Sequence, residues 1–261
     1  SAEHPNSSQI HLSKLEICRE RSFIICKKKL EIKAKKRLCQ IYTKVSLCYY
    51  FGMENVSIAE QKSVLRKRAR LELKKYFEDK ALGLQCAETV ADYFLKSKEY
   101  AEAQIIFAYM ALSDEVDLSL IIKKALDDKK KVALPRMSDD SGEMDFYFID
   151  SLEDSFSDDN KFGISEPSGK NKKVEPEKIP EKCVFLVPGL VFNLEGARLG
   201  RGKGYYDRYL NRIPHENHIF CGVCTVNVVT KAVPVEKSDF RMNYLLTEYG
   251  FIRTKVSSAG N

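Results

Sequence analysis

Residues 188–210 read PGLVFNLEGARLGRGKGYYDRYL. Three glycines at positions 200, 202 and 204 alternate with Arg201 and Lys203. Alternate glycines let backbone amides approach an anion closely, and the two cations bring positive charge to the same point. The Tyr-Tyr-Asp run that follows adds hydroxyl groups and a hard carboxylate within one turn, which suits a metal ion. The stretch therefore indicates a loop for a polyphosphate and its metal, and with it nucleotide chemistry.

The loop is expected to join a strand to a helix. An apolar run over 183–187 predicts a buried strand, and a helix is expected over about 204–212. Further out, the patterns predict a helix that opens at Ser57, helices over 84–96 and 114–126, and strands over 104–110, 131–135, 144–149, 218–223 and 244–247. Strands that alternate with helices are typical of a parallel sheet. We therefore expect an α/β fold: a three-layer αβα sandwich with a mostly parallel, open, Rossmann-like central sheet.

Two common phosphate-binding motifs do not describe the loop. A Walker A loop needs Ser or Thr after its Gly-Lys pair, but Gly204 follows Lys203, and Ala197 stands where its first glycine belongs. The dinucleotide fingerprint needs a glycine where Tyr205 stands. The alternative to a ligand-binding loop is a glycine-rich turn whose charges face solvent. The Lys-Gly-Tyr-Tyr-Asp sequence that continues the loop argues against this alternative. Since ligands bind beyond the carboxyl ends of parallel strands, the loop still predicts a ligand site.

The composition is that of a globular protein with a sizeable core. The chain has 261 residues, of which 44% are hydrophobic, and this suits one α/β domain or one domain with an appendage. No run approaches the roughly 18–20 uninterrupted apolar residues that a membrane helix needs. Eight cysteines in a chain of this length indicate reduced thiols rather than a disulfide scaffold, so a cytoplasmic location is expected.

Residues 1–52 differ from the rest of the chain in charge. They hold 11 Lys/Arg and 4 Asp/Glu, a net charge of +7, so the remainder of a chain with a total of +6 carries −1. A nucleic-acid footprint is therefore not indicated on the body of the protein. The segment is open to three interpretations: an organelle targeting segment, which would make a mitochondrial location possible; a gene-model artefact ahead of Met53; or a basic arm for RNA or a membrane. We expect a basic extension at 1–52 and a main domain at 53–261.

The run Arg198-Leu-Gly-Arg-Gly-Lys-Gly-Tyr-Tyr-Asp207 resembles the signature of the 5-formyltetrahydrofolate cyclo-ligase family, whose members are also called methenyltetrahydrofolate synthetases. Other segments resemble the family in the same order: Lys62-Ser-Val-Leu-Arg66, Pro135-Arg136, Phe162-Gly-Ile-Ser-Glu-Pro167, Pro188-Gly189 and a late acidic residue, Asp239. The resemblance covers about residues 57–250 and has no counterpart for 1–52. The family often has Phe-Asp where this chain has Phe192-Asn193, which puts the local loop geometry in question.

The resemblance implies a cyclo-ligase catalytic domain at 53–261 that uses ATP and Mg²⁺ to close 5-formyltetrahydrofolate to 5,10-methenyltetrahydrofolate, with ADP and phosphate as products. Positioning and charge neutralisation would supply most of the catalysis, as in other phosphoryl transfers. A small-molecule substrate, no nucleic-acid or membrane partner, and a monomer are expected. One alternative is another phosphoryl-transfer enzyme on a similar sheet, such as a small-molecule kinase. A third reading is a basic RNA- or membrane-associated protein that acts through residues 1–52.

The resemblance also implies roles for particular residues. The ATP site would comprise two residues of the first helix and nine of the loop: Lys62, Arg66, Arg198, Leu199, Gly200, Arg201, Gly202, Lys203, Gly204, Tyr205 and Tyr206. The folate would contact Met110, Glu115, Phe162, Arg201, Gly202, Lys203, Gly204 and Tyr205. The catalytic residues would be Arg201, Lys203 and Tyr205, and the Mg²⁺ ligands Asp207 and Asp239.

Physical arguments accompany some of these roles. Lys62 and Arg66 are four residues apart on a helix, so both can point at the same phosphates. A carboxylate at position 115 can accept hydrogen bonds from the amino and ring N–H groups of a pterin. The Cys221-Gly-Val-Cys224 run has the spacing of a redox motif, but it lies in an apolar strand pattern, so these thiols are expected in the core.

Overall fold

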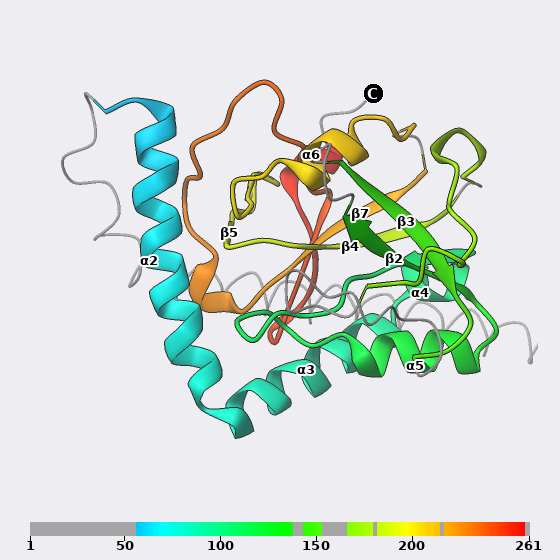
Figure 1. Ribbon diagram of the computed structural model, residues 1–261. Coiled ribbons are helices and arrows are strands. Elements are labelled where there is room, and N and C mark those ends of the chain that lie inside the picture. Colours follow the sequence, from blue (N-terminus) through cyan, green and yellow to red (C-terminus); the bar gives the residue numbers. More distant parts are fainter. Residues whose placement is uncertain (1–55, 138–142, 153–165, 180–181, 215–216, 259–261) are drawn as a thin grey trace, which may run out of the picture.

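The computed structural model describes residues 56–137, 143–152, 166–179, 182–214 and 217–258 (Figure 1). Phe162 and the extension 1–52 lie outside these ranges, so what was predicted for them stays a prediction. Within the described ranges no helix is both long enough and apolar enough to cross a membrane.

A mixed seven-stranded sheet forms the centre of the molecule, in the order β3-β2-β1-β4-β7-β8-β9. Its strands are β1 Ile105–Phe107, β2 Lys131–Met137, β3 Met144–Ile149, β4 Val184–Pro188, β7 Ile219–Val223, β8 Tyr244–Thr247 and β9 Gly250–Arg253. The five inner strands are parallel to one another, and the edge strands β3 and β9 are antiparallel to their neighbours. The expected mostly parallel sheet is confirmed.

Helices lie on both faces of this sheet, as the predicted three-layer sandwich requires. They are α2 Ile58–Glu78, α3 Lys80–Leu95, α4 Lys98–Glu102, α5 Ser119–Asp127 and α6 Tyr205–Leu210, with short 3₁₀ turns at η2 Pro176–Lys178, η3 Val226–Val228 and η4 Lys255–Ser258. In Figure 1, α3 and α5 lie below the sheet and α6 lies above it, while α2 stands at one end. The helix α2 buries a stripe at i, i+4 spacing, formed by Leu65, Ala69, Leu73 and Phe77.

Three phenylalanines from neighbouring strands align the middle of the sheet. Phe107 of β1 pairs in register with Phe185 of β4, which pairs with Phe220 of β7. The rings of Phe107 and Phe185 stack with centroids 4.0 Å apart, and those of Phe185 and Phe220 with centroids 5.0 Å apart. Such pairs contribute roughly 0.5–1.5 kcal/mol each beyond the area they bury. The row fixes the strands relative to one another, and the loops that follow them therefore meet at one edge.

Local capping explains where the observed helices begin. The Ser57 hydroxyl accepts a hydrogen bond from the Glu60 amide at 3.3 Å, which confirms the predicted start of α2. The helix α3 begins at Lys80, ahead of the expected residue 84, because the Asp79 carboxylate accepts from two amides of its first turn. The predicted helix over 114–126 was wrong at its start: α5 begins at Ser119, and residues 114 and 115 remain in a loop.

Two short pieces of sheet were not predicted. The strand β9 returns antiparallel to β8 after a two-residue turn. The stretch between β4 and α6 was expected as one long loop, but it contains a hairpin of β5 Val191–Phe192 and β6 Arg198–Leu199. The prediction that Cys221 and Cys224 lie in the core is confirmed, since they are 0% and 3% exposed.

Candidate active site

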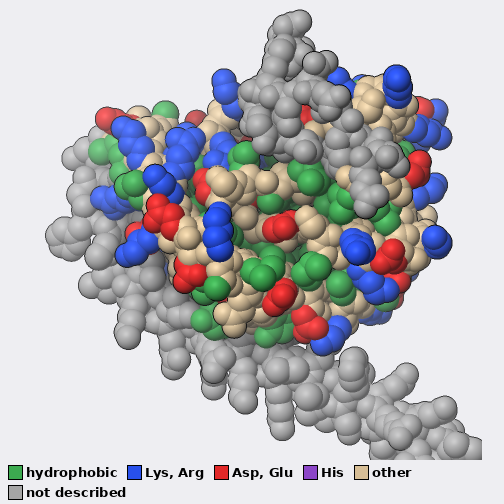
Figure 2. Space-filling model, turned by 60° about the horizontal axis from the view of Figure 1, so that its bottom comes forward, with side chains coloured by type: hydrophobic (Ala, Val, Ile, Leu, Met, Phe, Trp, Pro, Cys, Tyr) green, Lys and Arg blue, Asp and Glu red, His purple; other side chains and the backbone are tan. Residues whose placement is uncertain are grey.

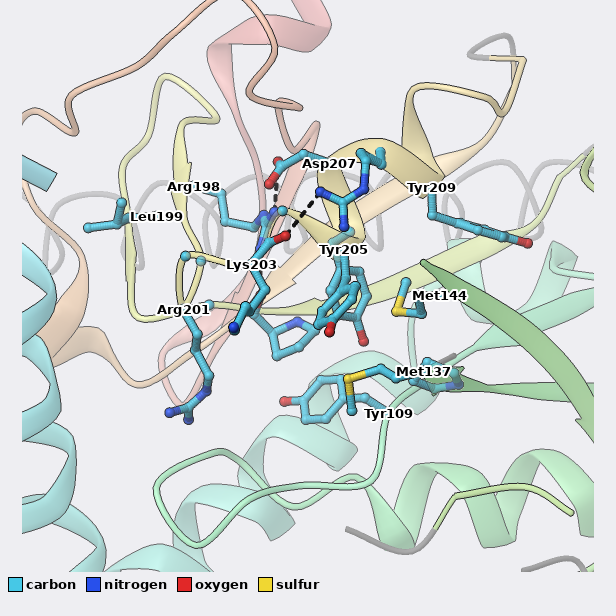
Figure 3. A pocket seen from close by; sticks show the side chains of 18 of the residues that line it. Tyr109, Met137, Met144, Arg198, Leu199, Arg201, Lys203, Tyr205, Asp207 and Tyr209 are labelled. Carbon is cyan, nitrogen blue, oxygen red and sulfur yellow. Dashed lines mark hydrogen bonds and ion pairs between the residues drawn. The ribbon is translucent and has the colours of Figure 1, made fainter. Parts of the chain in front are cut away.

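A cavity of about 980 Å³ opens at the carboxyl ends of β1, β2 and β4. It is walled by α2, the loop after β1, the 198–204 segment and α6, and Figure 3 shows its lining side chains. The lining includes every described residue that the sequence assigned to ATP, folate or metal: Lys62, Arg66, Met110, Glu115, Arg198, Leu199, Gly200, Arg201, Gly202, Lys203, Gly204, Tyr205, Tyr206, Asp207 and Asp239. Residues that are far apart in the sequence therefore share one space.

The glycine segment 200–204 has the backbone conformation that its sequence indicates. Gly202 has a φ of 109° and Gly204 a φ of 71°, a region that residues with a side chain rarely adopt. Two arginines of α2 hold this segment from the side. Arg66 Nε donates to the carbonyl of Gly200 at 3.0 Å, and Arg70 Nη2 donates to the carbonyl of Arg201 at 3.4 Å. The shape of the segment therefore depends on α2.

Asn193 shapes the turn of the β5–β6 hairpin. Its buried side-chain oxygen accepts a hydrogen bond from the Ala197 amide at 2.8 Å. Gly196, with a φ of 79°, completes the turn. An amide oxygen accepts this bond as a carboxylate oxygen would, so the departure from the family's Phe-Asp is compatible with the hairpin.

Arg198 is buried, and it holds Asp207 in place. Arg198 Nη2 donates to Asp207 Oδ1 at 2.7 Å and Nη1 donates to the carbonyl of Pro188 at 3.2 Å, while Nε has no partner among the described residues. The same Asp207 oxygen accepts from the Phe240 amide at 3.2 Å. A buried guanidinium that bonds a carboxylate and a carbonyl in this way ties both ends of the loop to α6.

Lys62 of α2 contacts two carboxylates of the segment that precedes β8. Its Nζ donates to Asp239 Oδ2 at 2.6 Å and to Glu236 Oε2 at 2.7 Å. Burial alone would lower the pKa of this ammonium, but its hydrogen bonds to the two carboxylates raise the pKa above the ordinary value. Lys62 therefore stays charged and fastens α2 to the 236–240 segment.

The two predicted metal ligands come together through the chain itself. Asp207 bonds the amide of Phe240, the residue that directly follows Asp239, and both carboxylates line the cavity. Each of them already bonds one cationic side chain. Within the described ranges no group of three or more His, Cys, Asp or Glu is arranged to hold a metal ion. Two carboxylates nevertheless fit Mg²⁺, because that ion is commonly held by one or two carboxylates together with phosphate oxygens and water.

Arg201 faces two carboxylates from the loop after β1. Its Nη2 donates to Asp114 Oδ1 at 2.5 Å, and its Nε donates to Glu115 Oε1 at 3.0 Å. Burial raises the pKa of Glu115 above its ordinary value, and the neighbouring Arg201 offsets this only in part. An acceptor of this kind suits N–H donors of a ligand ring.

Lys203 is an exposed cation of the cavity lining. In Figure 3 its side chain extends into the cavity between Arg201 and Tyr205. In the part of the chain that the structure describes, its ammonium makes no ion pair or hydrogen bond, while its backbone carbonyl accepts from Arg208 Nη1 at 3.0 Å. Arg208 also lies over the Tyr205 ring, with its guanidinium carbon 5.6 Å from the ring centre. Lys203 therefore offers positive charge to an incoming anion.

Several lining residues were missed by reasoning from sequence. Arg70 lies four residues after Arg66, and this helical spacing was a usable signal. Asp114, which bonds Arg201 from behind the lining, adjoins Glu115 and was expected within a helix. Met137 and Met144 pair in register at the open end of β2 and β3, and no motif marks them.

Comparison with known proteins identifies the group to which this architecture belongs. The sequence model of the 5-formyltetrahydrofolate cyclo-ligase family matches residues 58–248. A probable 5-formyltetrahydrofolate cyclo-ligase of Caenorhabditis elegans is 27% identical over 200 residues, which cover 74% of this chain and 95% of that protein. A mitochondrial 5-formyltetrahydrofolate cyclo-ligase of Arabidopsis thaliana is 31% identical over 168 residues, which cover 60% of this chain and 59% of that protein.

A solved structure agrees with these sequence matches. The 5,10-methenyltetrahydrofolate synthetase of Aquifex aeolicus superposes with a TM-score of 0.60 at 30% identity, covering 74% of this chain and 93% of that one. The matched residues 58–248 include the glycine segment 200–204, the carboxylates Asp207 and Asp239, and the loop after β1 that carries Glu115. The chain belongs to the 5-formyltetrahydrofolate cyclo-ligase family.

Proposed function

We propose that the chain catalyses the ATP-dependent cyclisation of 5-formyltetrahydrofolate to 5,10-methenyltetrahydrofolate, with release of ADP and phosphate. Besides family membership, one observation supports this proposal above the others. A single cavity joins a glycine segment with an uncompensated lysine, suited to a polyphosphate, to a carboxylate suited to the N–H donors of a pterin. A donor and an acceptor of a phosphoryl group can therefore meet inside it.

The chemistry explains why such an enzyme needs ATP. The N5-formyl group is amide-like, and its oxygen is a poor leaving group. Transfer of the γ-phosphoryl group forms a bond from that oxygen to phosphorus and releases ADP. N10 then attacks the formyl carbon, the carbon–oxygen bond breaks, and phosphate leaves with the former formyl oxygen while N10 loses its proton. The protein's contribution is to position the reactants and to neutralise charge.

The roles of the side chains follow from where their charges lie. Lys203 would neutralise charge on the moving phosphoryl group, assisted by Arg201 when a ligand engages the neighbouring carboxylates. Tyr205 would donate a hydrogen bond to the formyl oxygen or to the phosphate. Arg66 would hold the segment that wraps the triphosphate, since it already bonds the carbonyl of Gly200.

Mg²⁺ fits at Asp207 and Asp239, where it would neutralise phosphate charge when bound. In its absence Arg198 and Lys62 hold these carboxylates at the cavity wall. We further propose that the catalytic domain spans residues 53–261 and acts as a monomer in the cytoplasm. The Arabidopsis relative, named as mitochondrial, keeps an organelle location open for a chain with a functional targeting segment.

The decisive experiment incubates the purified chain with 5-formyltetrahydrofolate, ATP and magnesium chloride. We expect the near-ultraviolet absorbance of the methenyl product to appear, with one ADP released per turnover. Addition of excess chelator should stop the reaction, and excess Mg²⁺ should restore it. ADP formed without the methenyl chromophore would favour the kinase alternative, and a chromophore formed without ATP would contradict the proposal.

A further inference from the structure

Asp114 lies just behind the cavity lining, where it bonds Arg201, and neither the sequence motifs nor the proposed reaction uses it. It binds one edge of the Arg201 guanidinium: Nη2 donates to Oδ1 at 2.5 Å and Nη1 donates to Oδ2 at 3.3 Å. Glu115 Oε1 accepts from Nε at 3.0 Å and also lies 3.0 Å from Nη2. The guanidinium is thus shared between two neighbouring carboxylates: Asp114 contacts both Nη atoms, and Glu115 contacts Nε and the shared Nη2.

The charge of this cluster decides which kind of ligand it favours. Two carboxylates around one guanidinium leave a net charge of −1, which repels a polyphosphate and attracts donors of hydrogen bonds. Glu115 is the member best placed to meet a ring, because the Leu112 amide donates to its Oε2 at 3.1 Å and fixes its orientation. A ligand N–H group that bonds Oε1 then replaces the contacts of this oxygen with Arg201 Nε and Nη2.

We propose that Asp114 is a positioning residue of the folate site. It holds Arg201 by its two Nη atoms, and Arg201 therefore stays in place while the Glu115 carboxylate exchanges its contacts with Nε and Nη2 for the N–H groups of the pterin. This inference rests on the proposed function. Without Asp114, Arg201 and Glu115 would form a two-bond pair of guanidinium and carboxylate, the strongest arrangement open to them. That pair would compete with the folate for the same oxygens.

The test measures binding rather than turnover, so that it does not depend on the chemical step. Isothermal titration gives the Kd of 5-formyltetrahydrofolate and, separately, of a non-hydrolysable ATP analogue with Mg²⁺. We expect Asp114→Ala and Asp114→Asn to weaken folate binding about tenfold or more and not to weaken binding of the ATP analogue, because the variants remove negative charge. Asp114→Glu should recover part of the affinity. Asp92→Ala is the matched control, because that carboxylate also pairs with a cation, but this cation, Lys96, does not line the cavity as Arg201 does.

A double-mutant cycle separates positioning from a merely structural role. If Asp114 acts through Arg201, then Arg201→Ala and the double variant with Asp114→Ala bind the folate equally. Unchanged folate affinity in both Asp114→Ala and Asp114→Asn, or an equal loss with and without Arg201, would overturn the role of Asp114. A wild-type chain that binds no 5-formyltetrahydrofolate would instead contradict the proposed function. Circular dichroism spectra confirm that each variant is folded, and the asparagine variant serves if the alanine variant is not.

Discussion

At the scale of single residues, three cations of the site already pair with carboxylates, whereas the ammonium of Lys203 pairs with none among the described residues. Lys62, Arg198 and Arg201 each bond carboxylates at 2.5–2.7 Å. Lys203, by contrast, has an ammonium without such a partner in the described structure and extends into the cavity (Figure 3). Cations that are already paired with carboxylates fix the geometry of the site. An unpaired cation can stabilise the negative charge that develops in the transition state.

Lys203→Ala should therefore reduce kcat more than it perturbs the fold. We expect a loss of about 10²–10³ in kcat/KM, as for removal of one preorganised charge from a transition state. The measurement is steady-state formation of the methenyl chromophore. Lys67→Ala removes the same charge from the exposed face of α2, outside the cavity, and should leave the rate unchanged. Equal rates for wild type and Lys203→Ala would contradict the role given to this lysine.

The raised pKa of Glu115 predicts how folate binding depends on pH. Burial, only partly offset by Arg201, places this pKa above the ordinary 4.5. Only the ionised carboxylate accepts N–H donors with both oxygens, so binding should weaken as the pH falls through the raised pKa. Titrations that extend downward from neutral pH should show this acid limb in the wild type. The limb should disappear in Glu115→Gln, and its persistence there would assign it to another group.

At the scale of elements, α2 acts as a wall of the site and not only as part of the core. One face of α2 buries Leu73, which is 3% exposed. In the two preceding turns, Arg66 and Arg70 donate hydrogen bonds to carbonyls of the glycine segment. Figure 2 shows a gathering of Lys and Arg side chains at the left edge, on the side where α2 lies in Figure 1, whereas acidic, basic and hydrophobic side chains are interspersed elsewhere on that face. The helix therefore joins packing to ligand binding.

Two leucines of α2 offer a matched pair for testing this. Leu73→Ala should lower the free energy of unfolding by about 2–5 kcal/mol, because it empties a packed site. Leu71, two residues earlier, is 69% exposed, and its change to Ala should stay within about 0.5 kcal/mol. Urea unfolding followed by circular dichroism measures both. Similar values for the two variants would show that α2 is not packed as described.

The elements also show what sequence reasoning can and cannot supply. The 198–207 segment was predictable because its residues are contiguous and each glycine and charge has a local reason. Asp114 was not, because an acidic residue near a helix start has an ordinary local explanation. Its contact with Arg201 joins residues 87 positions apart and exists only once β1 and β4 pair. The strand β9 has four residues, too few for an alternation of apolar and polar side chains to distinguish a strand from a turn.

At the scale of the whole molecule, the described sheet and helices carry the site. The family match spans residues 58–248, and every lining residue among the described ones lies within it. We therefore expect a chain that starts at Met53 to retain kcat and both KM values within about twofold, since it keeps all of these lining residues. Turnover assays on the full and shortened chains test this. A large loss of activity would show that residues 1–52 contribute to catalysis.

The bonds that join α2 to the rest of the cavity link distant parts of the polypeptide: Arg66 reaches Gly200 across 134 positions, and Lys62 reaches Asp239 across 177. During synthesis at about 5–20 residues per second, Arg66 waits on the order of ten seconds until Gly200 is made. The pocket is therefore among the last features to be completed as the protein is made. A nascent chain halted before residue 236 would lack both carboxylates that neutralise the buried Lys62.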